Sequence, residues 1–482
     1  TATFSGILIA GCDAVSATSQ LRIMEPYASG VNYSAFTAQA QTGNILYTLP
    51  AADAAGALTS DGAGGLTWTP ASGSMDITGL TATDTALDDY LPEYDTSATA
   101  NRKVSVARMG GFFDPGICNG RLTTISGQPV SPDSGQIPSS TDTVGDSVTF
   151  LNPHNWPTAQ PVSVPFTAGG LTADTVYYTA GSGNSCSFYP TAADAQASTN
   201  KINLTAAITT QVSPSAIYFS PYKGNRVALY DGTRWSLYTF SEVSLILGSL
   251  TANKPYDVFL YDNAGTLTLE LLVWTNDTTR ATALVLQDGV YVKTGATTRR
   301  YVGTIYTISV CSTADTGTPP GGQGPQRLVL SYYNKVPRGM RVCPGYVNDN
   351  ALTTYSPAGT NWTAANGGTN SKLMFLTDGE NPVPYLVVGN MTNSTVSAGT
   401  GVGGGEDSTS SPATVSIANP ATAGNYEGGS CGRDNWIPVA GYHTLNLLVL
   451  GASGTGTFAA DRGRSGATAD PEATYITGTV MG

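Results

Sequence analysis

Hydrophobic residues in this chain fall into short runs, and glycine, proline or small polar residues separate one run from the next. Over 57–68, short apolar pieces lie on both sides of Asp61-Gly62, and Leu66 and Trp68 alternate onto one face, which predicts a β-hairpin with a tight turn. A second hairpin is predicted over 258–271, with its turn at 262–265. Because alternation with a period of two sends one face of a strand into a core, the pattern predicts an all-β fold.

Two phrases, at 171–177 and 250–256, place a leucine six residues before a tyrosine, with a turn between them. Sandwich proteins use such a spacing to bring a tyrosine back over its own turn, so we expect this arrangement at both phrases. A short helix is expected at 239–247, because Thr239 and Glu242 have the spacing of a capping box.

The pattern also predicts how the chain is divided. The divisions are an N-terminal segment over 1–43, a β-rich stretch of short strands over 44–110, a β-sandwich-like body over 111–345, and a last β module over 346–482. The body holds an inserted small β-sandwich at about 133–213, where short strands recur at regular spacing. Strands as short as those over 44–110 cannot bury a core alone, so three chains are expected to share one in a homotrimer.

Charge is sparse in this sequence and predominantly negative. Charged residues make up 12% of the chain, about half the share in an ordinary soluble domain. The formal net charge of -12 repels nucleic-acid phosphate and anionic membranes, so neither is an expected partner. Hydrophobic residues still reach 40%, which argues against a disordered chain.

Residue patterns typical of catalytic, metal and cofactor sites are missing. The six cysteines are widely scattered without metal-ligand spacing, and we interpret them as small, mostly buried apolar side chains. The only histidines are His154 and His443, and neither completes a hydrolase motif. The glycine-rich string at 399–404 belongs to no βαβ unit. We therefore expect no enzyme activity, no catalytic residue, no metal site and no cofactor.

Paired carboxylates need separate treatment, because glycoside cleavage uses two acids about 5–10 Å apart. The candidate pairs are Asp88 with Asp89, Asp257 with Asp262, and Glu406 with Asp407. Each pair lies beside glycine, serine, threonine or asparagine, so we interpret all three as solvated carboxylates in turns.

Four aromatic residues cluster around loops in the last part of the chain, namely Trp362, Tyr385, Tyr426 and Trp436. Tyrosine and tryptophan offer flat, amphipathic faces that suit sugar stacking and protein recognition. As a group they are the predicted receptor-contact surface. Packing in a core is the alternative for any one of them.

Several phrases of this sequence resemble the fibre and spike proteins of bacteriophage particles. They lie at 45–68, 89–104, 120–130, 217–232 and 441–482, and begin with Tyr47-Thr48-Leu49-Pro50 and Leu66-Thr67-Trp68. The resemblance implies a homotrimeric fibre on the virion surface, assembled in the host cytoplasm. In such a fibre, residues 1–43 would be the attachment segment, 44–110 the β-rich shaft and 346–482 the C-terminal β knob. It further implies that the N-terminal segment binds other virion proteins and that the C-terminal part binds a glycan or protein of the host surface.

The resemblance leaves the place and the task of such a fibre open. An adhesive tail fibre is the first hypothesis. A head fibre or decoration protein mounted on the capsid is the second, and a tailspike that degrades glycans is the third.

Overall fold

The chain was analysed in a computed structural model. It describes residues 20–24, 33–37, 46, 48, 50–52, 57–60, 66–69, 90–95, 100–105, 114–130, 132–317, 324–343, 354–355, 361–368, 371–419, 421–423, 427–452, 456–459 and 474–482. The chain divides into two units, Thr1–Ala86 and Leu87–Gly482. The described residues form an all-β protein with many separate sheets, as the hydrophobic pattern predicted.

The first unit contains two short antiparallel hairpins. They pair β1 (Gln20–Met24) with β2 (Tyr33–Thr37) and β3 (Ala57–Ser60) with β4 (Leu66–Thr69). The second hairpin confirms the prediction over 57–68, and its register sets Leu58 opposite Trp68. Leu58 nevertheless remains 43% exposed, so this hairpin does not enclose its own apolar side chain.

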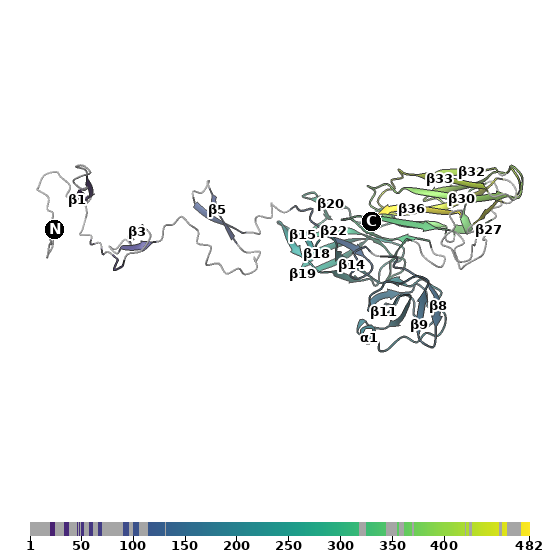
Figure 1. Cartoon of the computed structure of the whole chain (residues 1–482), viewed down its shortest axis with the longest axis horizontal. Helices are drawn as coiled ribbons and strands as arrows, with labels where there is room; N and C mark the ends of the chain where they lie inside the picture. Colours follow the sequence, from purple (N-terminus) through teal and green to yellow (C-terminus); the bar gives the residue numbers. More distant parts are fainter. Residues whose placement is uncertain are drawn as a thin grey trace. The chain divides into compact units, whose positions relative to one another are not determined.

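The second unit begins with a hairpin of β5 (Tyr90–Asp95) and β6 (Ala100–Ser105). The segment expected to be an insertion, 133–213, then folds mainly into one six-stranded antiparallel sheet (Figure 1). In sheet order its strands are β13 (Ser213–Pro214), β10 (Gln160–Ser163), β11 (Tyr177–Ser182), β12 (Ser185–Tyr189), β9 (Ser147–Phe150) and β8 (Pro138–Asp142). The short helix α1 (Ala192–Ala197) follows β12, and we refer to this region as the insertion sheet.

The body continues with small sheets on either side of the insertion in sequence. One joins β17 (Val243–Ile246), β14 (Ala216–Pro221) and β7 (Gly120–Thr123), and another pairs β15 (Arg226–Tyr230) with β16 (Trp235–Thr239). Strand β17 occupies the stretch expected to be helical, so that prediction was wrong. The Glu242 carboxylate accepts hydrogen bonds from the Ser126 hydroxyl and the Gly127 N–H instead of capping a helix.

The main sheet of the body, which we call the body sheet, carries several residues that line a pocket. In order it contains β19 (Thr266–Val273), β18 (Pro255–Asn263), β22 (Ala296–Tyr306), β21 (Val290–Lys293) and β20 (Leu284–Gln287), and β25 (Val329–Ser331) also pairs with β22. Strands β18 and β19 form the hairpin predicted over 258–271, which is confirmed.

Two larger sheets form the C-terminal part of the second unit. The first contains, in order, β23 (Asp315–Thr316), β24 (Gln326–Arg327), β29 (Lys372–Thr377), β34 (Gly441–Gly451), β31 (Thr400–Glu406) and β32 (Thr414–Ala418). Strand β28 (Thr363–Ala364) also pairs with β34, and the 3-10 turn η3 (Ala365–Gly368) follows β28 in the chain. The second contains β26 (Pro337–Val342), β36 (Tyr475–Met481), β30 (Tyr385–Asn393), β35 (Gly456–Ala459) and β27 (Thr354–Tyr355), with β33 (Glu427–Arg433) beside β30.

The boundary expected at 345 does not separate these sheets from the body. Strands β24 and β26 precede it, yet they pair with the C-terminal strands β29 and β36, and β23 joins the first of these sheets through β24. The backbone groups of a strand need partners along both edges. Strands β24 and β26 find such partners far along the chain, a connection that local sequence patterns do not reveal.

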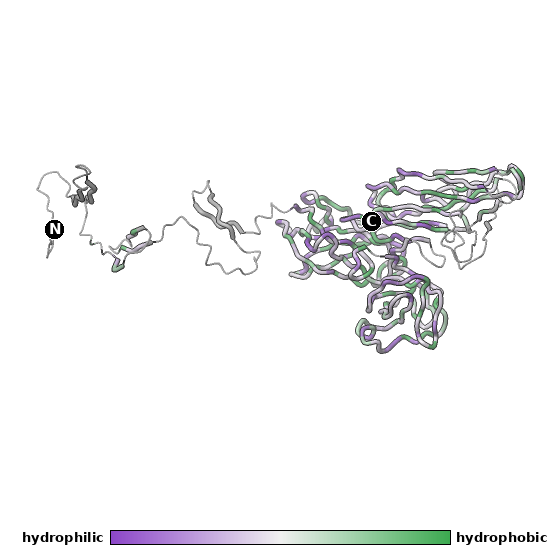
Figure 2. The backbone as a smooth tube through the Cα atoms, in the orientation of Figure 1, coloured by the Kyte–Doolittle hydropathy of each residue, from purple (hydrophilic) through white to green (hydrophobic). Residues whose placement is uncertain are grey.

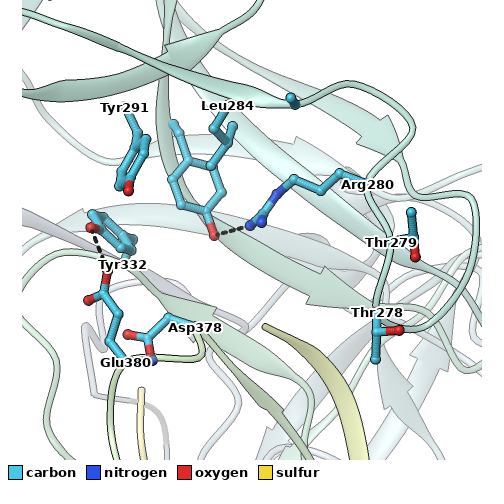
Figure 3. A pocket seen from close by; sticks show the side chains of 10 residues that line it. Thr278, Thr279, Arg280, Leu284, Tyr291, Tyr332, Asp378 and Glu380 are labelled. Carbon is cyan, nitrogen blue, oxygen red and sulfur yellow. Dashed lines mark hydrogen bonds between the residues drawn. The ribbon is translucent and has the colours of Figure 1, made fainter. Parts of the chain in front are cut away.

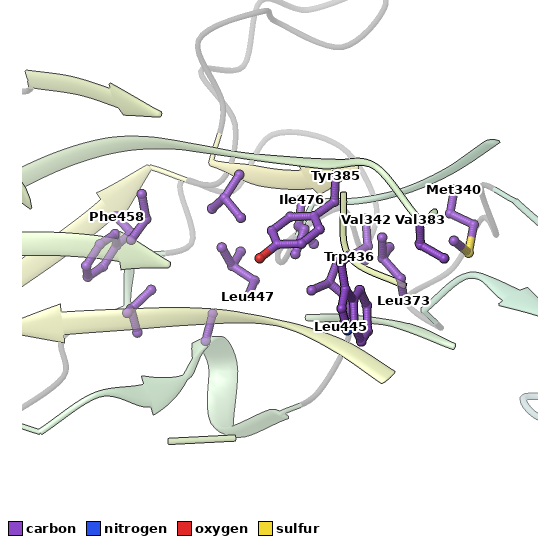
Figure 4. Close-up of a cluster of buried hydrophobic side chains, with 14 of the residues drawn as sticks. Met340, Val342, Leu373, Val383, Tyr385, Trp436, Leu445, Leu447, Phe458 and Ile476 are labelled. Carbon is purple, nitrogen blue, oxygen red and sulfur yellow. The ribbon is translucent and has the colours of Figure 1, made fainter. Parts of the chain in front are cut away.

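Hydrophobic side chains of the two C-terminal sheets meet in a shared core. It includes Phe375, Leu445, Leu447, Phe458 and Ile476, and Figure 4 shows several of these side chains between the strands. Figure 2 shows hydrophobic and hydrophilic residues interleaved through this region, as expected for strands with one buried face. Among the described residues, no helix is both long and apolar enough to cross a membrane.

The two repeated turns adopt the same geometry. The Tyr177 hydroxyl accepts a hydrogen bond from the Thr172 N–H at 2.9 Å, and the Tyr256 hydroxyl accepts one from the Thr251 N–H at 2.7 Å. In both turns the residue three before the tyrosine has a positive φ, of 54°. The predicted return of each tyrosine over its own turn is confirmed.

Candidate functional site

A pocket of about 390 Å³ lies between the body sheet and the first C-terminal sheet. We call it the tyrosine pocket. Its lining residues are Thr278, Thr279, Arg280, Ala283, Leu284, Tyr291, Tyr301, Tyr332, Asp378 and Glu380. Figure 3 shows Tyr291 and Tyr332 on one side, Thr278 and Thr279 on the other, and Asp378 and Glu380 beneath them.

A tight turn after β19 positions Arg280. The Thr275 N–H donates to the Thr279 carbonyl at 2.9 Å, and Trp274 forms an isolated β-bridge with Arg280. The guanidinium group lies over the Trp274 indole, with its carbon 4.3 Å from the ring centroid. A cation over the face of a tryptophan is stabilised by the ring quadrupole, so the turn and the ring together fix the arginine head group.

Three tyrosine rings make up the aromatic wall of the pocket. Tyr291 comes from β21, Tyr301 from β22, and Tyr332 follows β25 directly. The Tyr332 ring centroid lies 5.7 Å from that of Tyr291 and 5.3 Å from that of Tyr301. Tyr333 packs edge-on against Tyr332 at 5.2 Å. These contacts are within the range of favourable aromatic pairs, so the wall is a rigid surface.

A further wall, beneath the tyrosines, is the turn that follows β29 (Figure 3). The Asp378 Oδ1 atom accepts the Glu380 N–H at 2.9 Å, which folds the loop back on itself. Gly379 has a φ of +82°, and a Cβ atom there would lie 2.8 Å from the backbone nitrogen of Ala440. A larger residue at this position would therefore clash and adopt a strained backbone. Lys335 forms ion pairs with both Asp378 and Glu380 and so ties this wall to the end of the body.

A buried polar network supports Arg280 from below. The Arg280 Nε atom donates to Asp257 Oδ2 at 2.9 Å, and Thr304 Oγ1 donates to Asp257 Oδ1 at 3.0 Å. The Thr304 hydroxyl has one proton and donates it to Asp257. The hydrogen bond between Thr304 and the Tyr301 hydroxyl, 2.7 Å long, is therefore donated by Tyr301. That leaves the Tyr301 oxygen to accept from Arg280 Nη2, at 3.5 Å. Asp257 is only 1% exposed, so this network is closed to solvent on its inner side.

Burial and neighbouring charges set the protonation of the lining groups. Burial raises the pKa of Tyr301 and of Tyr332, so both phenols keep their protons at neutral pH. Burial also raises the pKa of Asp378, but hydrogen bonds from Lys335 and from the Glu380 N–H outweigh it and bring the pKa below its ordinary value of 3.8. Asp378 is therefore a carboxylate at neutral pH.

The pocket thus combines flat aromatic faces with donors and acceptors in fixed positions. Arg280 has more N–H groups than the two bonded to Asp257 and Tyr301. The Glu380 side chain is 53% exposed and has two long contacts, 3.3 Å from Lys335 Nζ and 3.5 Å from the Tyr332 hydroxyl. Such a site can hold a small polar ligand with apolar faces.

Two of the four aromatic residues predicted to contact a receptor lie in the core instead. Tyr385 is 4% exposed and Trp436 is 8% exposed, and Figure 4 shows both within the C-terminal core. They are buried because β30 and the segment before β34 turn these side chains toward Phe375 and Ile476. The prediction was wrong for Tyr385 and Trp436. Trp362 is partly exposed, and Tyr426 lies outside the described residues.

The interpretation of the carboxylates as solvated turn groups holds for Asp262 but fails for Asp257 and Glu406. The Asp262 carboxylate accepts the Gly265 N–H in the hairpin turn at 2.7 Å. Asp257, by contrast, is buried against Arg280, and Glu406 forms a 2.9 Å ion pair with Arg433. Asp88 and Asp89 lie outside the described residues.

Both histidines use their ring nitrogens for structural hydrogen bonds. His154 Nδ1 accepts the Trp156 N–H at 3.0 Å, and Nε2 lies 3.2 Å from the Ser185 carbonyl oxygen. His443 Nδ1 lies 2.7 Å from Asp407 Oδ2, and Nε2 lies 2.8 Å from the Val439 carbonyl oxygen. Neither histidine therefore has a ring nitrogen free to activate a hydroxyl nucleophile.

Metal-binding clusters and disulfides were also sought within the described ranges. There, no group of three or more histidine, cysteine, aspartate or glutamate residues could hold a metal ion. Five cysteines fall in those ranges, namely Cys118, Cys186, Cys311, Cys343 and Cys431, and all are free thiols. Three of them are buried, in keeping with their interpretation as small apolar side chains.

Comparisons with known proteins do not assign this chain to a family. No family model and no curated protein matches it. Among solved structures, it is similar to the insecticidal delta-endotoxin Cry8Ea1 of Bacillus thuringiensis, at 6% identity and a TM-score of 0.17, over 56% of this chain and 49% of the toxin. A Cry1Da tryptic core variant of the same organism matches at 8% identity and a TM-score of 0.15, over 56% and 48%. The matches span about half of each toxin, and TM-scores this low support no conclusion on fold or function.

Proposed function

We propose that this chain is a non-catalytic, glycan-binding fibre or spike protein of a bacteriophage virion. The observation that carries the binding role is the tyrosine pocket, in which Tyr291, Tyr301 and Tyr332 face Arg280 and Glu380. The virion assignment rests on the sequence phrases that resemble phage fibre and spike proteins.

A sugar suits this pocket better than most small ligands. Sugar rings have apolar C–H faces that pack on tyrosine, and hydroxyl groups that both donate and accept hydrogen bonds. Arg280 and Tyr291 can donate, and Glu380 can accept. The pocket volume of about 390 Å³ lies at the small end of the usual range for ligand sites, which favours one or two sugar residues.

The lining carboxylates favour binding over cleavage. Glycoside hydrolysis needs a second carboxyl group as nucleophile or base beside the general acid. Asp378 is held by Lys335, by Asn381 and by backbone N–H groups, and Asp257 is buried against Arg280. Glu380 is then left as a single accessible carboxylate in this pocket, which is too few for the two-carboxylate mechanism.

Oligomer, attachment and location belong to the same proposal. The chain forms a homotrimer on the virion surface, and its N-terminal segment binds a tail or capsid protein. The exposed side chains of Leu46 and Leu58 support a shared core, because association of three chains would bury them. A head fibre or decoration protein would use the same pocket, so tail and head remain alternatives.

A glycan array probed with the full-length chain tests the binding role. We expect binding to a subset of glycans, and we expect Tyr291→Ala to weaken it at least tenfold because the variant removes an aromatic face. Tyr222→Ala is the matched control, since Tyr222 is exposed and does not line the pocket. Equal binding by the wild type and Tyr291→Ala would contradict the assignment of the pocket.

Incubation with the bound glycan separates the adhesive protein from a glycan-degrading tailspike. We expect the length of the glycan to stay constant over hours. Progressive shortening would establish the tailspike alternative instead.

A further inference from the structure

We infer that the tyrosine pocket selects uncharged sugars over acidic ones, and that Glu380 is the specificity-determining residue. The inference rests on the proposed function, because it takes the pocket to be a glycan site. It goes further by naming the class of sugar and the group that distinguishes it.

The charges around the pocket leave an excess of negative charge. The cations are Arg280 and Lys335, and the carboxylates are Asp257, Asp378 and Glu380. An anionic ligand would therefore enter a site whose fixed charges already sum to a negative value.

Arg280 does not act as an anion receptor here, although an arginine often does. Its Nε atom is bonded to Asp257 at 2.9 Å, and the Asp257 side chain is almost fully buried. The same guanidinium group stacks over Trp274, 4.3 Å from the ring centroid. Since its charge is compensated by a buried partner, it presents N–H donors to a ligand with little net positive potential.

Lys335 likewise forms ion pairs within the protein. Its ammonium group pairs with Asp378, and it lies 4.7 Å from the centre of the Tyr332 ring. The Lys335 side chain has only 16% of its surface exposed. One ammonium group shared between two carboxylates cannot neutralise both of them.

The excess negative charge of the pocket lies on the Glu380 carboxylate, which a ligand can reach. Its side chain is 53% exposed, and its contacts with Lys335 and Tyr332 are 3.3 and 3.5 Å long. A carboxylate only accepts hydrogen bonds, so Glu380 can bind the hydroxyl groups of a neutral sugar. A sugar carboxylate in the same place would have no proton to donate and would be repelled.

The size of the repulsion is large enough to measure. Two like charges about 4 Å apart cost about a fivefold loss in affinity in a water-like dielectric, and more at the lower effective dielectric of a protein surface. Neutral sugars should therefore bind at least about tenfold more tightly than matched acids at low salt. The difference should shrink as salt screens the charges.

Matched pairs of monosaccharides provide the test. The methyl glycosides of glucose, galactose and mannose are each compared with the corresponding uronic acid, which replaces the C6 hydroxymethyl group by a carboxylate. Dissociation constants are measured by ligand-observed NMR with the full chain at pH 7. Glu380→Gln removes the charge but keeps the shape, and Glu427→Gln removes the same charge on the distant part of β33 as a control.

The wild type and Glu427→Gln are expected to prefer the neutral member of each bound pair at least about tenfold. Glu380→Gln is expected to reduce this preference to about threefold or less, mainly by improving the binding of the acid. Equal or tighter binding of the acid by the wild type would overturn the inference while glycan binding survives. An unchanged preference in Glu380→Gln would overturn the role of Glu380. If the chain bound neither neutral nor acidic sugars, either in solution or on the glycan array, the result would instead count against the proposed function.

Discussion

The insertion sheet and the body sheet contain the same kind of tyrosine turn, which leads into β11 in the insertion and into β18 in the body. The two regions nevertheless differ in the polar side chains that they bury. In the insertion, the buried His154 ring bonds to a backbone N–H and a backbone carbonyl. In the body, the buried Asp257 bonds to the side chains of Arg280 and Thr304. The first arrangement ties a loop to strand β12 through backbone groups. The second fixes a side chain that lines a pocket.

This difference indicates where a site can be sought in an all-β chain without catalytic motifs. A buried ion pair costs desolvation free energy and often stabilises a fold no more than apolar residues would. The buried ion pair of Asp257 and Arg280 has this desolvation cost, and it lies in the body sheet next to the tyrosine pocket. We take the pair as a positioning device for Arg280, whereas His154 is part of the packing of its own module.

The largest expected effect comes from breaking the buried pair. Asp257→Ala leaves the Arg280 charge without its partner and should lower the free energy of unfolding by about 3–5 kcal/mol. Asp262→Ala is the control on the same strand, because it removes a turn carboxylate and should cost only about 1 kcal/mol. Urea denaturation measures both, and equal losses would show that the pair does not stabilise the body sheet.

Breaking the tyrosine turn should lower the free energy of unfolding by a smaller amount, and by the same amount in the two regions. Tyr177→Phe and Tyr256→Phe each remove one hydroxyl acceptor from a backbone N–H, and each should cost about 1 kcal/mol. Tyr222→Phe, at an exposed position, should change the free energy of unfolding by less than about 0.5 kcal/mol. Should one turn variant unfold the chain while the other has no effect, the two turns would not be equivalent.

Acid should affect the two regions in different pH ranges, and this is the smallest effect. Burial lowers the pKa of His154 below its ordinary value of 6.5, although its bond to Ser185 opposes this. The unfolded chain therefore binds the proton more readily, and the insertion loses stability as the pH falls below about 6.5. The pKa of Asp378 is also lowered, from 3.8, so its stabilising effect is lost only as the pH falls below about 4.

Hydrogen exchange resolved by segment can distinguish these two ranges. Between pH 6.5 and 4.5, protection should fall in the insertion sheet and persist in the loop after β29. His154→Gln should remove the first change, and Asp378→Asn should remove the later loss near Asp378. A simultaneous loss of protection in both regions would contradict separate titrations.

Features set by neighbouring residues could be predicted from the sequence. Alternation and turn residues located the hairpins at 57–68 and 258–271, and the spacing of Leu250 and Tyr256 located a turn. The helix expected near Glu242 failed because strand pairing between β14 and β17 outweighed a local capping signal. Likewise, the glycine-rich stretch over 400–406 forms strand β31, since its partners on β34 and β32 supply the ladder.

The candidate site depends on residues that only the tertiary fold brings together. Arg280, Tyr332 and Glu380 come from a turn, the end of β25 and a loop of another sheet. The aromatic prediction instead favoured Tyr385 and Trp436, because a cluster in sequence does not show which side chains face the core. One signal was present: Asp257 lies within an apolar strand, where a charged residue needs a partner.

The most direct test of this account is an experimental structure of the full chain with its best-binding glycan. The account predicts an ordered sugar in the tyrosine pocket, with a C–H face against Tyr291 or Tyr332 and a hydroxyl bonded to Glu380. An ordered sugar elsewhere, for example on the partly exposed Trp362, with the tyrosine pocket unoccupied, would contradict it.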